Sequence, residues 1–555
     1  MRVGAMLGAT SALSSLQTIA RSLYQALSAR HELVFLDPAY NYVPDAEQKR
    51  MLDEFFRRCD VVVGIPGPVL GAARRAAGRN VPFVRFLYGE MGFGAWGLVD
   101  GRGVLDTNDV FVANCASDVD IANAFFTNLP TRVVPFAFDA ADFHPVSPQE
   151  RRAAREALAI GEHDPVVLYA GRINPEKNVR EVLRIFRVVS RRLPDAHLVL
   201  AGAIDGGGPL GAMFNVAPAW FPNTFKALIS RLGLPGERVH PVGKAGPGRM
   251  RELYGLADVM VNLTLNPDEN FGLGQVEAMA CGTPVVGTRW GGLKDTVVEG
   301  VTGHGVSTVA TGTGVKVDWW EAANRTIALL EDRPARERFR ESLPRHAGRH
   351  YSQEAFAAAV EEIVRAAFEN RGRPAEPLRS TPFADEFWSV CNFGSDVAAP
   401  FRRGPRSEEL YRALAAPSCG VTASHVAAGD PLEPDQVLSL ATPVETDGTG
   451  GLRPDHAFYP FRVEVPEAHR PAVHAILAVM RDEPALTAAR LTGARLEGVP
   501  GVPGALGWMF DAGLVLRTRH VPGWIDPADV DGRLGEVLFS VQPIDRAATD
   551  LIVYR

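Results

Sequence analysis

Several features that mark particular classes of protein are scarce or absent in this sequence of 555 residues. It has only five cysteines, and they are widely spaced, which argues against a disulfide framework and indicates a reducing compartment. These cysteines form no metal-ligand pattern, so we expect no metal site. The formal net charge of −7 argues against a nucleic-acid partner, which would require a concentrated basic face.

Long apolar segments are also missing. No hydrophobic run approaches the length of a membrane span, so we expect no transmembrane segment. Residues 1–7 look like a short strand and lack the longer apolar stretch and cleavage site of a signal peptide. We therefore expect a cytoplasmic protein. Peripheral contact with an anionic membrane through the arginines of residues 180–191 stays open, although a solvated helix face is the favoured interpretation.

The composition is that of a globular protein with more than one core. Hydrophobic residues make up 46% of the chain and charged residues 22%, and a chain of this length predicts three or four domains. In the N-terminal half, short apolar runs alternate with amphipathic helical segments, which is typical of a parallel sheet wrapped by helices. The fold class is therefore α/β.

The last third of the chain differs from the rest. Residues 371–377 look like a linker, and the stretch after residue 378 is rich in proline and glycine. A helix is expected near residues 466–481, with strands at 460–465, 514–518, 537–541 and 551–554. This pattern predicts a small α+β module. Its role stays open among acceptor recognition, homo-oligomer formation and docking to another protein.

Two acids in one glycine-containing run are the first candidate site. Glu269 and Glu277 are separated by seven residues that include Gly272 and Gly274. A helix that begins near Leu273 would direct unpaired N–H groups at an anion such as a diphosphate, with one carboxylate before the helix and one a turn inside it. That arrangement suits a sugar nucleotide. The alternative is a helix with an acidic surface.

Two cations follow an earlier buried strand. This strand ends at Gly171, and the loop after it carries Arg172 and Lys177. Two positive charges at the carboxyl end of a strand can balance the charge on a departing nucleoside diphosphate. Alternatively, both are surface residues near the start of the helix at 179–193. A later strand ends at Gly202, and the glycine-rich loop after it, residues 203–209, leaves the backbone open to a ribose or phosphate.

These motifs resemble those of retaining glycosyltransferases of family 4. The run from Glu269 to Glu277, with its Phe-Gly-Leu centre and its Gly-Thr-Pro-Val-Val continuation, resembles the E-x7-E segment of that family. Gly171-Arg172 followed by Lys177 matches the family's Gly-Arg…Lys signature, with Asn178 where glycine is usual. The resemblance covers about residues 1–371.

The resemblance implies a GT-B architecture, in which two Rossmann-like domains face a cleft. Residues 1–158 would form the acceptor domain, completed by a crossing helix near 351–371. Residues 159–345 would form the nucleotide-sugar donor domain. The α+β extension at 378–555 matches no family that we recognise.

The implied activity is transfer of a sugar from a nucleoside-diphosphate sugar to an acceptor hydroxyl, with retention at the anomeric carbon and without a metal or other cofactor. Glycans, lipid-linked glycans and secondary metabolites stay open as acceptors. The implied catalytic residues are Glu269, Arg172 and Lys177. The implied donor-binding residues are Glu277, Phe271, Gly272, Leu273, Gly202, Val242 and Gly8.

One family feature is missing. Members usually carry a histidine just after the strand that here begins at Phe83, and residues 83–91 contain none. Tyr88 or Glu90 is a candidate to contact donor or acceptor in its place. The gap leaves open a non-catalytic GT-B scaffold or binding module. A sugar-nucleotide epimerase or a sugar phosphorylase on the same fold is a further alternative.

Overall fold

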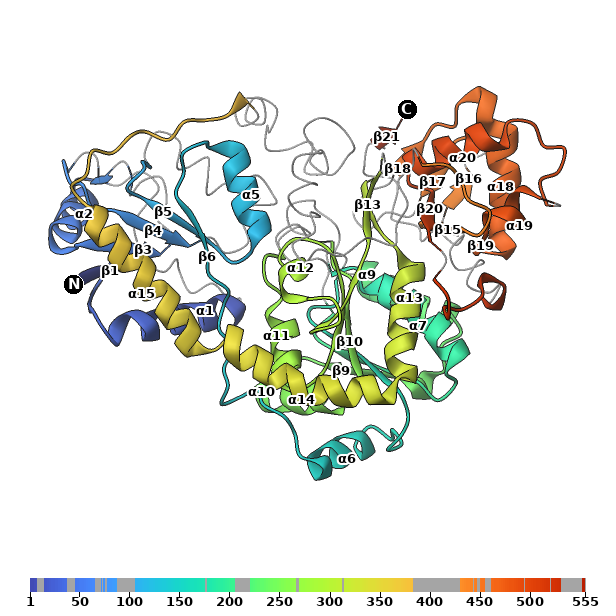
Figure 1. The fold of residues 1–555 in the computed structure, drawn as a ribbon, viewed down its shortest axis with the longest axis horizontal. Coiled ribbons are helices and arrows are strands. Elements are labelled where there is room, and N and C mark those ends of the chain that lie inside the picture. The colour runs from blue at the N-terminus through green and yellow to red at the C-terminus, as the bar shows by residue number, and fades with distance from the viewer. Residues whose placement is uncertain are drawn as a thin grey trace.

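The computed structural model places three bodies side by side along the long axis of the molecule (Figure 1). Two of them contain a parallel six-stranded sheet each, and the third contains two small sheets. The structure describes residues 1–6, 14–36, 45–64, 71, 73–74, 77–86, 105–174, 177–204, 220–265, 269–311, 314–382, 430–442, 444–446, 450–454, 461–493, 495–519, 521–530 and 552–554.

The first domain is built on the sheet β2-β1-β3-β4-β5-β6, in which all neighbours are parallel. Its central strands are buried along their length, as in a sheet covered by helices on both faces. The strands are β1 Arg2–Met6, β2 Glu32–Phe35, β3 Val61–Gly64, β4 Phe83–Phe86, β5 Val110–Ala113 and β6 Thr131–Val133. The covering helices include α1 Ser14–Ser28, α2 Ala46–Arg58 and α5 Ala116–Phe125.

The second domain repeats this plan with the sheet order β12-β11-β10-β7-β8-β9, again parallel throughout. Its strands are β7 Val166–Ala170, β8 His197–Ala201, β9 Val239–Gly243, β10 Val259–Asn262, β11 Val285–Thr288 and β12 Gly303–Val306. Its helices are α7 Val179–Arg192, α9 Trp220–Arg231, α10 Pro247–Leu256, α11 Leu273–Ala280, α12 Leu293–Thr296 and α13 Trp319–Glu331. The hairpin β13 Thr308–Thr311 and β14 Gly314–Val317 extends from β12.

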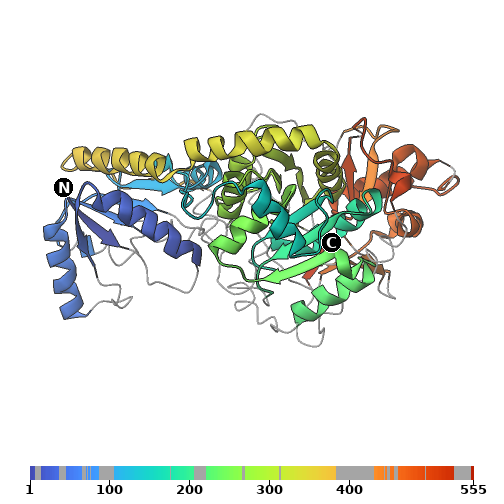
Figure 2. The ribbon, with the colours of Figure 1, turned by 90° about the horizontal axis from the view of Figure 1, so that it is seen from below.

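Two long helices connect the domains along one side of the molecule (Figure 2). Helix α14, Arg333–His350, belongs to the second domain, and α15, Gln353–Asn370, crosses onto the first. There His31 Nε2, next to β2, lies 2.7 Å from Glu361 Oε2 of α15. Helix α15 is predicted from the sequence, whereas α14 is not, because residues 333–350 are dense in arginine and contain Pro344. Its few buried apolar residues, such as Phe339 and Leu343, make a weak periodic signal.

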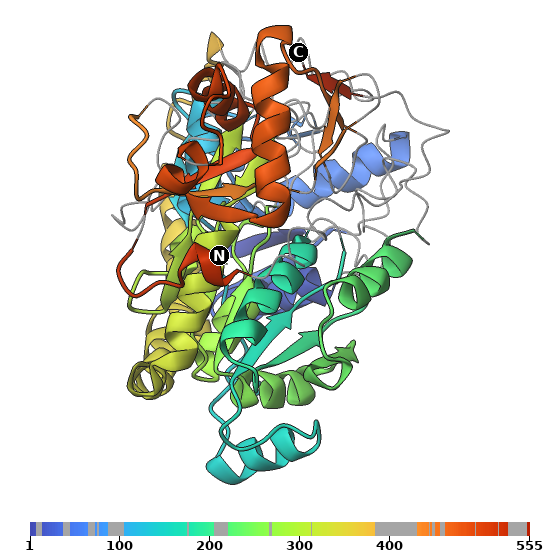
Figure 3. The ribbon, with the colours of Figure 1, turned by 90° about the vertical axis from the view of Figure 1, so that its right-hand side faces the viewer.

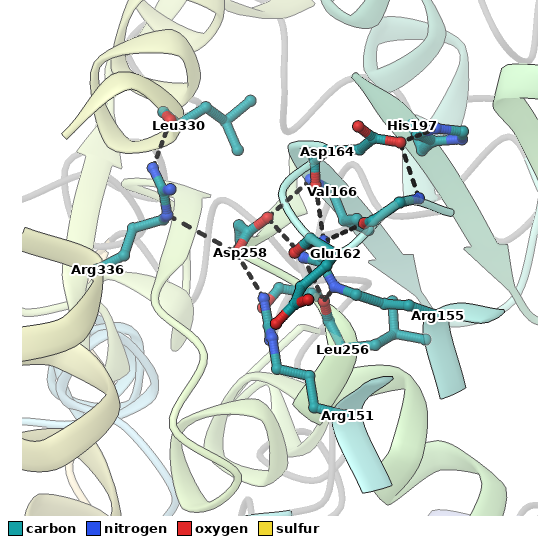
Figure 4. A network of polar contacts seen from close by, with 12 residues as sticks. Arg151, Arg155, Glu162, Asp164, Val166, His197, Leu256, Asp258, Leu330 and Arg336 are labelled. Carbon is teal, nitrogen blue, oxygen red and sulfur yellow. Dashed lines mark hydrogen bonds and ion pairs between the residues drawn. The ribbon is translucent and has the colours of Figure 1, made fainter. Parts of the chain in front are cut away.

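A buried aspartate ties the second sheet to the helices around it (Figure 4). Asp258, just before β10, accepts a hydrogen bond from the Val166 N–H, and Arg151 and Arg155 of α6, Pro148–Glu156, donate to it at 2.8 and 2.9 Å. Arg336 of α14 lies 3.7 Å away. Burial alone raises the pKa of Asp258, but these arginines outweigh burial and hold it below the ordinary value.

The C-terminal module has its own apolar core and two sheets, β19-β15-β20 and β16-β17-β18-β21. The strands are β15 Val437–Leu440, β16 Val444–Thr446, β17 Leu452–Pro454, β18 Phe461–Val463, β19 Ala485–Thr487, β20 Val515–Thr518 and β21 Ile552–Tyr554. Its main helices are α18 Arg470–Asp482, α19 Ala488–Thr492 and α20 Val502–Asp511. The predicted α+β character is confirmed, and the strand predicted at 537–541 lies outside the described residues.

This module is bonded to helix α13 of the second domain. Trp319 Nε1 donates to the Leu440 carbonyl oxygen at 2.7 Å, and the Thr518 hydroxyl donates to Asp318 at 2.6 Å. The Ile525 N–H donates to Asn324 at 2.7 Å. Figure 3, which looks onto the module, shows it lying over one end of the second domain. These hydrogen bonds are buried or partly buried, so the C-terminal module and the second domain share a packed interface.

The stretch 371–377, predicted as a linker, continues along the first domain. The Glu376 carbonyl oxygen accepts from the Thr107 N–H at 3.0 Å, and the Pro377 carbonyl oxygen accepts from Asn128 Nδ2 at 3.1 Å. The Arg379 carbonyl oxygen accepts from the Thr127 N–H at 3.1 Å. The chain therefore stays attached to the first domain as far as residue 381, where the Thr381 N–H donates to the carbonyl oxygen of Phe125.

The favoured interpretation of residues 180–191 as a solvated basic face is wrong for part of helix α7. Arg184 is only 4% exposed and its guanidinium contacts Glu181, one turn earlier. Burial and the nearby Arg184 lower the pKa of Arg180 to about 9. Arg180 and Arg187 are partly exposed and Arg191 is exposed, so the solvated interpretation fails at Arg184 but fits the end of the helix. Among the described residues, no helix is long and apolar enough to cross a membrane.

Candidate functional site

Two of the predicted site residues, Lys177 and Glu269, meet where the strand order of the second sheet reverses. From β7 the chain continues to β8 and β9 on one side, whereas β10, on the other side of β7, leads to β11 and β12. Parallel sheets bind ligands outside the carboxyl ends of the strands at such a switch point. Arg172 and Lys177 follow β7, and Glu269 follows β10. Strand pairing therefore brings together segments that are 92 residues apart, and Lys177 Nζ forms an ion pair with Glu269 Oε2.

The loop after β7 is held by its own polar contacts. The Tyr169 hydroxyl donates to the Arg172 carbonyl oxygen at 2.6 Å, and the Lys177 N–H donates to Asn174 Oδ1 at 3.1 Å. Asn178, where the family usually has glycine, adopts the left-handed conformation with φ 52° and donates from Nδ2 to the Leu263 carbonyl oxygen. Asparagine tolerates this conformation better than most residues, so α7 can begin here without the glycine that is usual in the family.

Glycines line the ends of the adjacent strands. The Gly171 N–H donates to the Ala201 carbonyl oxygen and the Gly202 N–H to that of Gly243, both at 2.9 Å. A Cβ atom on Gly202 would lie 1.8 Å from the Gly171 carbonyl oxygen, and the φ of Gly202 is +154°, so no other residue fits there. Beside this edge, Val242 is partly exposed near the end of β9. A ligand can approach the backbone closely at this edge.

Helix α11 begins at Leu273, as predicted, and Gly272 precedes it in the left-handed conformation with φ +76°. Within the described residues no side chain caps this end, so its first N–H groups remain available to a ligand. The loop before it is packed tightly: the Gly292 N–H donates to the Glu269 carbonyl oxygen at 2.9 Å. A Cβ on Gly292 would lie 2.0 Å from the Asn270 carbonyl oxygen. Glu269 is therefore held by a backbone contact as well as by its ion pair.

Glu277 lies one turn inside α11. Its Oε2 accepts a 3.0 Å hydrogen bond from the hydroxyl of Tyr254, on α10. Burial raises the pKa of Glu277 to about 7, while the Tyr254 bond lowers it and Asp142 raises it. The carboxyl group therefore changes charge near neutral pH, a common property of functional groups.

Not every predicted residue presents its side chain to this site. Phe271 is 4% exposed, and its ring packs edge-on against Phe136 and Tyr351 at 5.4 and 5.7 Å between centroids. Only its backbone is therefore left for a ligand. Gly8, Tyr88 and Glu90 lie outside the described residues.

Sequence reasoning missed two contributors. Tyr254 belongs to no motif, and nothing in its spacing marks it as a partner of Glu277. Helix α5 of the first domain was also missed: the Ala116 N–H donates to Asp295 Oδ2 at 2.6 Å and the Ser117 hydroxyl to the Gly291 carbonyl oxygen at 3.2 Å. The start of α5 thus packs on the segment that holds the loop of Glu269.

The arrangement suits an anionic ligand with hydroxyl groups. It combines cations after β7, a glycine edge, an open helix start and two carboxylates, which match a diphosphate joined to sugars. Among the described residues, no three His, Cys, Asp or Glu side chains gather as metal ligands.

Comparison with known proteins finds similarity to glycosyltransferases. Residues 150–346, which include the second sheet and most of α14, match the family model described as "Glycosyl transferases group 1". D-inositol 3-phosphate glycosyltransferase of Corynebacterium glutamicum is 30% identical over 276 residues, which are 49% of this chain and 61% of the relative. The enzyme of the same name from Segniliparus rotundus is 31% identical over 288 residues, which are 51% and 57% of the two chains. The chain thus spans less than two thirds of each relative.

The crystal structure of Anabaena Alr3699/HepE in complex with UDP superposes with a TM-score of 0.50 and 18% identity, covering 66% of this chain and all of the other. At that identity the likeness concerns the fold. With the two parallel sheets, it confirms the predicted GT-B architecture of two Rossmann-like domains.

Proposed function

We propose that this chain is a retaining glycosyltransferase that moves a sugar from a nucleoside-diphosphate sugar to an acceptor hydroxyl. The observation that carries the proposal is the meeting of the Lys177 loop, Glu269 and the open start of α11 at the switch point of the second sheet. The match of this domain to group 1 glycosyltransferases supports it.

In this proposal the diphosphate lies between Arg172, Lys177 and the first N–H groups of α11. As the bond between the anomeric carbon and the diphosphate breaks, negative charge grows on the departing oxygen, and these cations and N–H groups stabilise it. Glu269 holds hydroxyls of the transferred sugar, and Glu277 holds the ribose. No metal is required by this scheme, because basic side chains and a helix terminus supply the positive potential.

The acceptor would approach from the first domain. Its hydroxyl oxygen bonds to the anomeric carbon on the face that the diphosphate leaves, so configuration is retained, and the hydroxyl proton passes to the departing diphosphate oxygen. Exclusion of water favours this transfer over hydrolysis. The relatives are named for inositol 3-phosphate, and the acceptor of this chain is proposed only as a hydroxyl compound. UDP is the first nucleotide to test, since Alr3699/HepE crystallised with it.

A thermal-shift panel of UDP, GDP, ADP and dTDP, alone and with their common sugars, tests the donor. We expect one nucleotide to raise the melting temperature of the wild-type protein, and Arg172→Ala and Lys177→Ala to lose that shift. Arg152→Ala, an exposed arginine on α6, is the matched control and keeps the shift. A protein that no nucleotide stabilises would contradict the proposal.

Turnover of a labelled donor then tests transfer. Binding without turnover on any glycan, lipid-linked or small-molecule acceptor would support a non-catalytic GT-B module instead. A requirement for inorganic phosphate would indicate a phosphorylase, and interconversion of the nucleotide sugar without an acceptor would indicate an epimerase.

A further inference from the structure

Tyr254 is fixed on three sides although no motif marked it. Its ring is 1% exposed and packs edge-on against Phe143, with 6.0 Å between the centroids. Its carbonyl oxygen accepts a 2.6 Å hydrogen bond from the Thr283 hydroxyl, and its own hydroxyl donates to Glu277 at 3.0 Å. A buried side chain held in this way has a single direction in which to point its hydroxyl.

That hydroxyl lies at the start of α11, beside the end of β7. A Cβ atom on Gly274 would lie 3.3 Å from the Tyr254 oxygen and 3.9 Å from the Ala170 carbonyl oxygen. Gly274 is one turn before Glu277 on the same face of the helix. Because position 274 has no side chain, α11 leaves open a space that is bounded by the Tyr254 hydroxyl, the Met260 methyl group at 3.8 Å from that Cβ position, and the Ala170 carbonyl oxygen at the carboxyl end of β7, where the nucleotide is proposed to bind.

The groups that face Glu277 make its charge depend on Tyr254. They are Tyr254 on α10, Asp142 in the segment that joins the two domains, and Cys281 at the end of α11 itself. Asp142 and burial both raise the pKa of Glu277, and the hydrogen bond from Tyr254 is the interaction that lowers it. A carboxylate accepts hydrogen bonds from two hydroxyls, whereas a protonated carboxyl group has lost part of that capacity.

We propose that Tyr254 is a positioning residue of the donor site: its hydroxyl fixes one carboxylate oxygen of Glu277 and leaves the other to the ribose hydroxyls of the nucleotide. This inference rests on the proposed function, because it assumes that a nucleoside diphosphate binds here. It deepens that function because it assigns to Tyr254 and Glu277 together the preference for a ribose over a sugar that lacks the 2′ and 3′ hydroxyls.

The test compares UDP with 2′,3′-dideoxy-UDP by calorimetry, on the wild-type protein and on Tyr254→Phe. If the thermal-shift panel selects GDP or ADP, that nucleotide and its dideoxy form replace them. Phenylalanine keeps the ring against Phe143 and the backbone bond to Thr283, so the fold is retained. We expect the variant to bind UDP about fivefold more weakly, as for loss of one typical hydrogen bond, and to bind the dideoxy form as the wild type does.

The pH dependence provides a second readout. UDP affinity should fall in the wild-type protein as pH drops through about 7, the pKa of Glu277. Since the Tyr254 bond lowers that pKa, the midpoint should move to higher pH in Tyr254→Phe. The terminal phosphate titrates at about pH 6 in both ligands, so the midpoint of Glu277 is the part of the UDP profile that the dideoxy form should lack.

Thr283→Val is the structural control. It removes the hydroxyl that holds the Tyr254 carbonyl oxygen but leaves the Tyr254 hydroxyl and Glu277 in place. We expect it to lower the melting temperature without changing the preference for UDP over its dideoxy form. Equal weakening of both ligands in Tyr254→Phe, or an unchanged preference and pH midpoint, would overturn the inference. If no nucleotide binds the wild-type protein, the proposed function itself fails first.

Discussion

The ammonium group of Lys177 and the carboxylate of Glu269 form an ion pair that joins the loop after β7 to the loop after β10. Their side chains are 18% and 17% exposed, so solvent screens the pair only in part. The cation proposed to receive a diphosphate is thus already neutralised by the acid proposed to hold the sugar. A diphosphate must compete with Glu269 for Lys177.

This competition predicts that Glu269→Gln separates binding from transfer. Because the glutamine no longer neutralises Lys177, UDP without a sugar should bind about three- to fivefold more tightly, as expected for release of one partly exposed ion pair. Sugar transfer should be lost. Calorimetry with UDP and turnover of a labelled donor measure the two effects. Glu252→Gln, which alters the ion pair with Arg249 on α10, should bind UDP as the wild type does. Weaker UDP binding by Glu269→Gln would contradict the prediction.

The C-terminal module should contribute to the stability of the second domain. Trp319→Phe removes the indole N–H that donates to the Leu440 carbonyl oxygen and leaves that oxygen buried without its donor. We expect a loss of about 1–3 kcal/mol in the free energy of unfolding, measured by urea denaturation. Arg462→Ala, which breaks a partly exposed ion pair with Glu464 inside the module, is the control and should change it by less than about 1 kcal/mol. Equal effects of the two substitutions would argue against a packed interface between the C-terminal module and the second domain.

The Asp258 network predicts a large effect from a nearly isosteric change. In Asp258→Asn, Arg151 and Arg155 keep their carbonyl partners but lose the buried negative charge. Breaking a buried ion pair by removing one partner costs about 3–5 kcal/mol, so a clear fall in the urea midpoint is expected. Asp195→Asn, whose side chain is 73% exposed and pairs with Arg238, should change stability by less than about 1 kcal/mol. A small change in the urea midpoint of Asp258→Asn would mean that hydrogen bonds to carbonyl oxygens are enough to stabilise the two arginines.

Asp318 predicts a pH dependence of stability. Burial, reinforced by Glu321, raises the pKa of Asp318 to about 7, whereas in the unfolded chain it titrates near 3.8. The folded protein therefore binds one proton more between these values, and the contribution of Asp318 to stability falls as pH rises from about 4 to about 7. In Asp318→Asn this slope, at most about 1.4 kcal/mol per pH unit, should disappear. Unfolding by urea at several pH values measures it. Identical slopes in the two proteins would contradict the assignment.

Local features of the site could be predicted because they depend on short stretches of chain. Gly272 marked the start of α11, because glycine adopts the left-handed backbone conformation at this position without steric cost. Asn178 could replace glycine for the same reason. Predictions at other positions failed because the burial of a side chain depends on segments that are distant in the sequence. The arginines of α7 look like a solvated stripe in sequence, yet Arg184 is covered by the packed structure. Helix α14 was missed because few of its residues are apolar.

The amino-acid sequence by itself determined the residue types of the site, the helix that opens at Leu273 and the α/β alternation of the first two domains, because these follow from local backbone preference and from hydrophobic periodicity. Only the tertiary structure decided which of these residues meet. Lys177 reaches Glu269 because β7 and β10 pair across the switch point of the sheet, and Tyr254 reaches Glu277 because α10 packs beside α11. Such contacts depend on strand order and helix packing, which are set by how the whole chain buries its apolar surface.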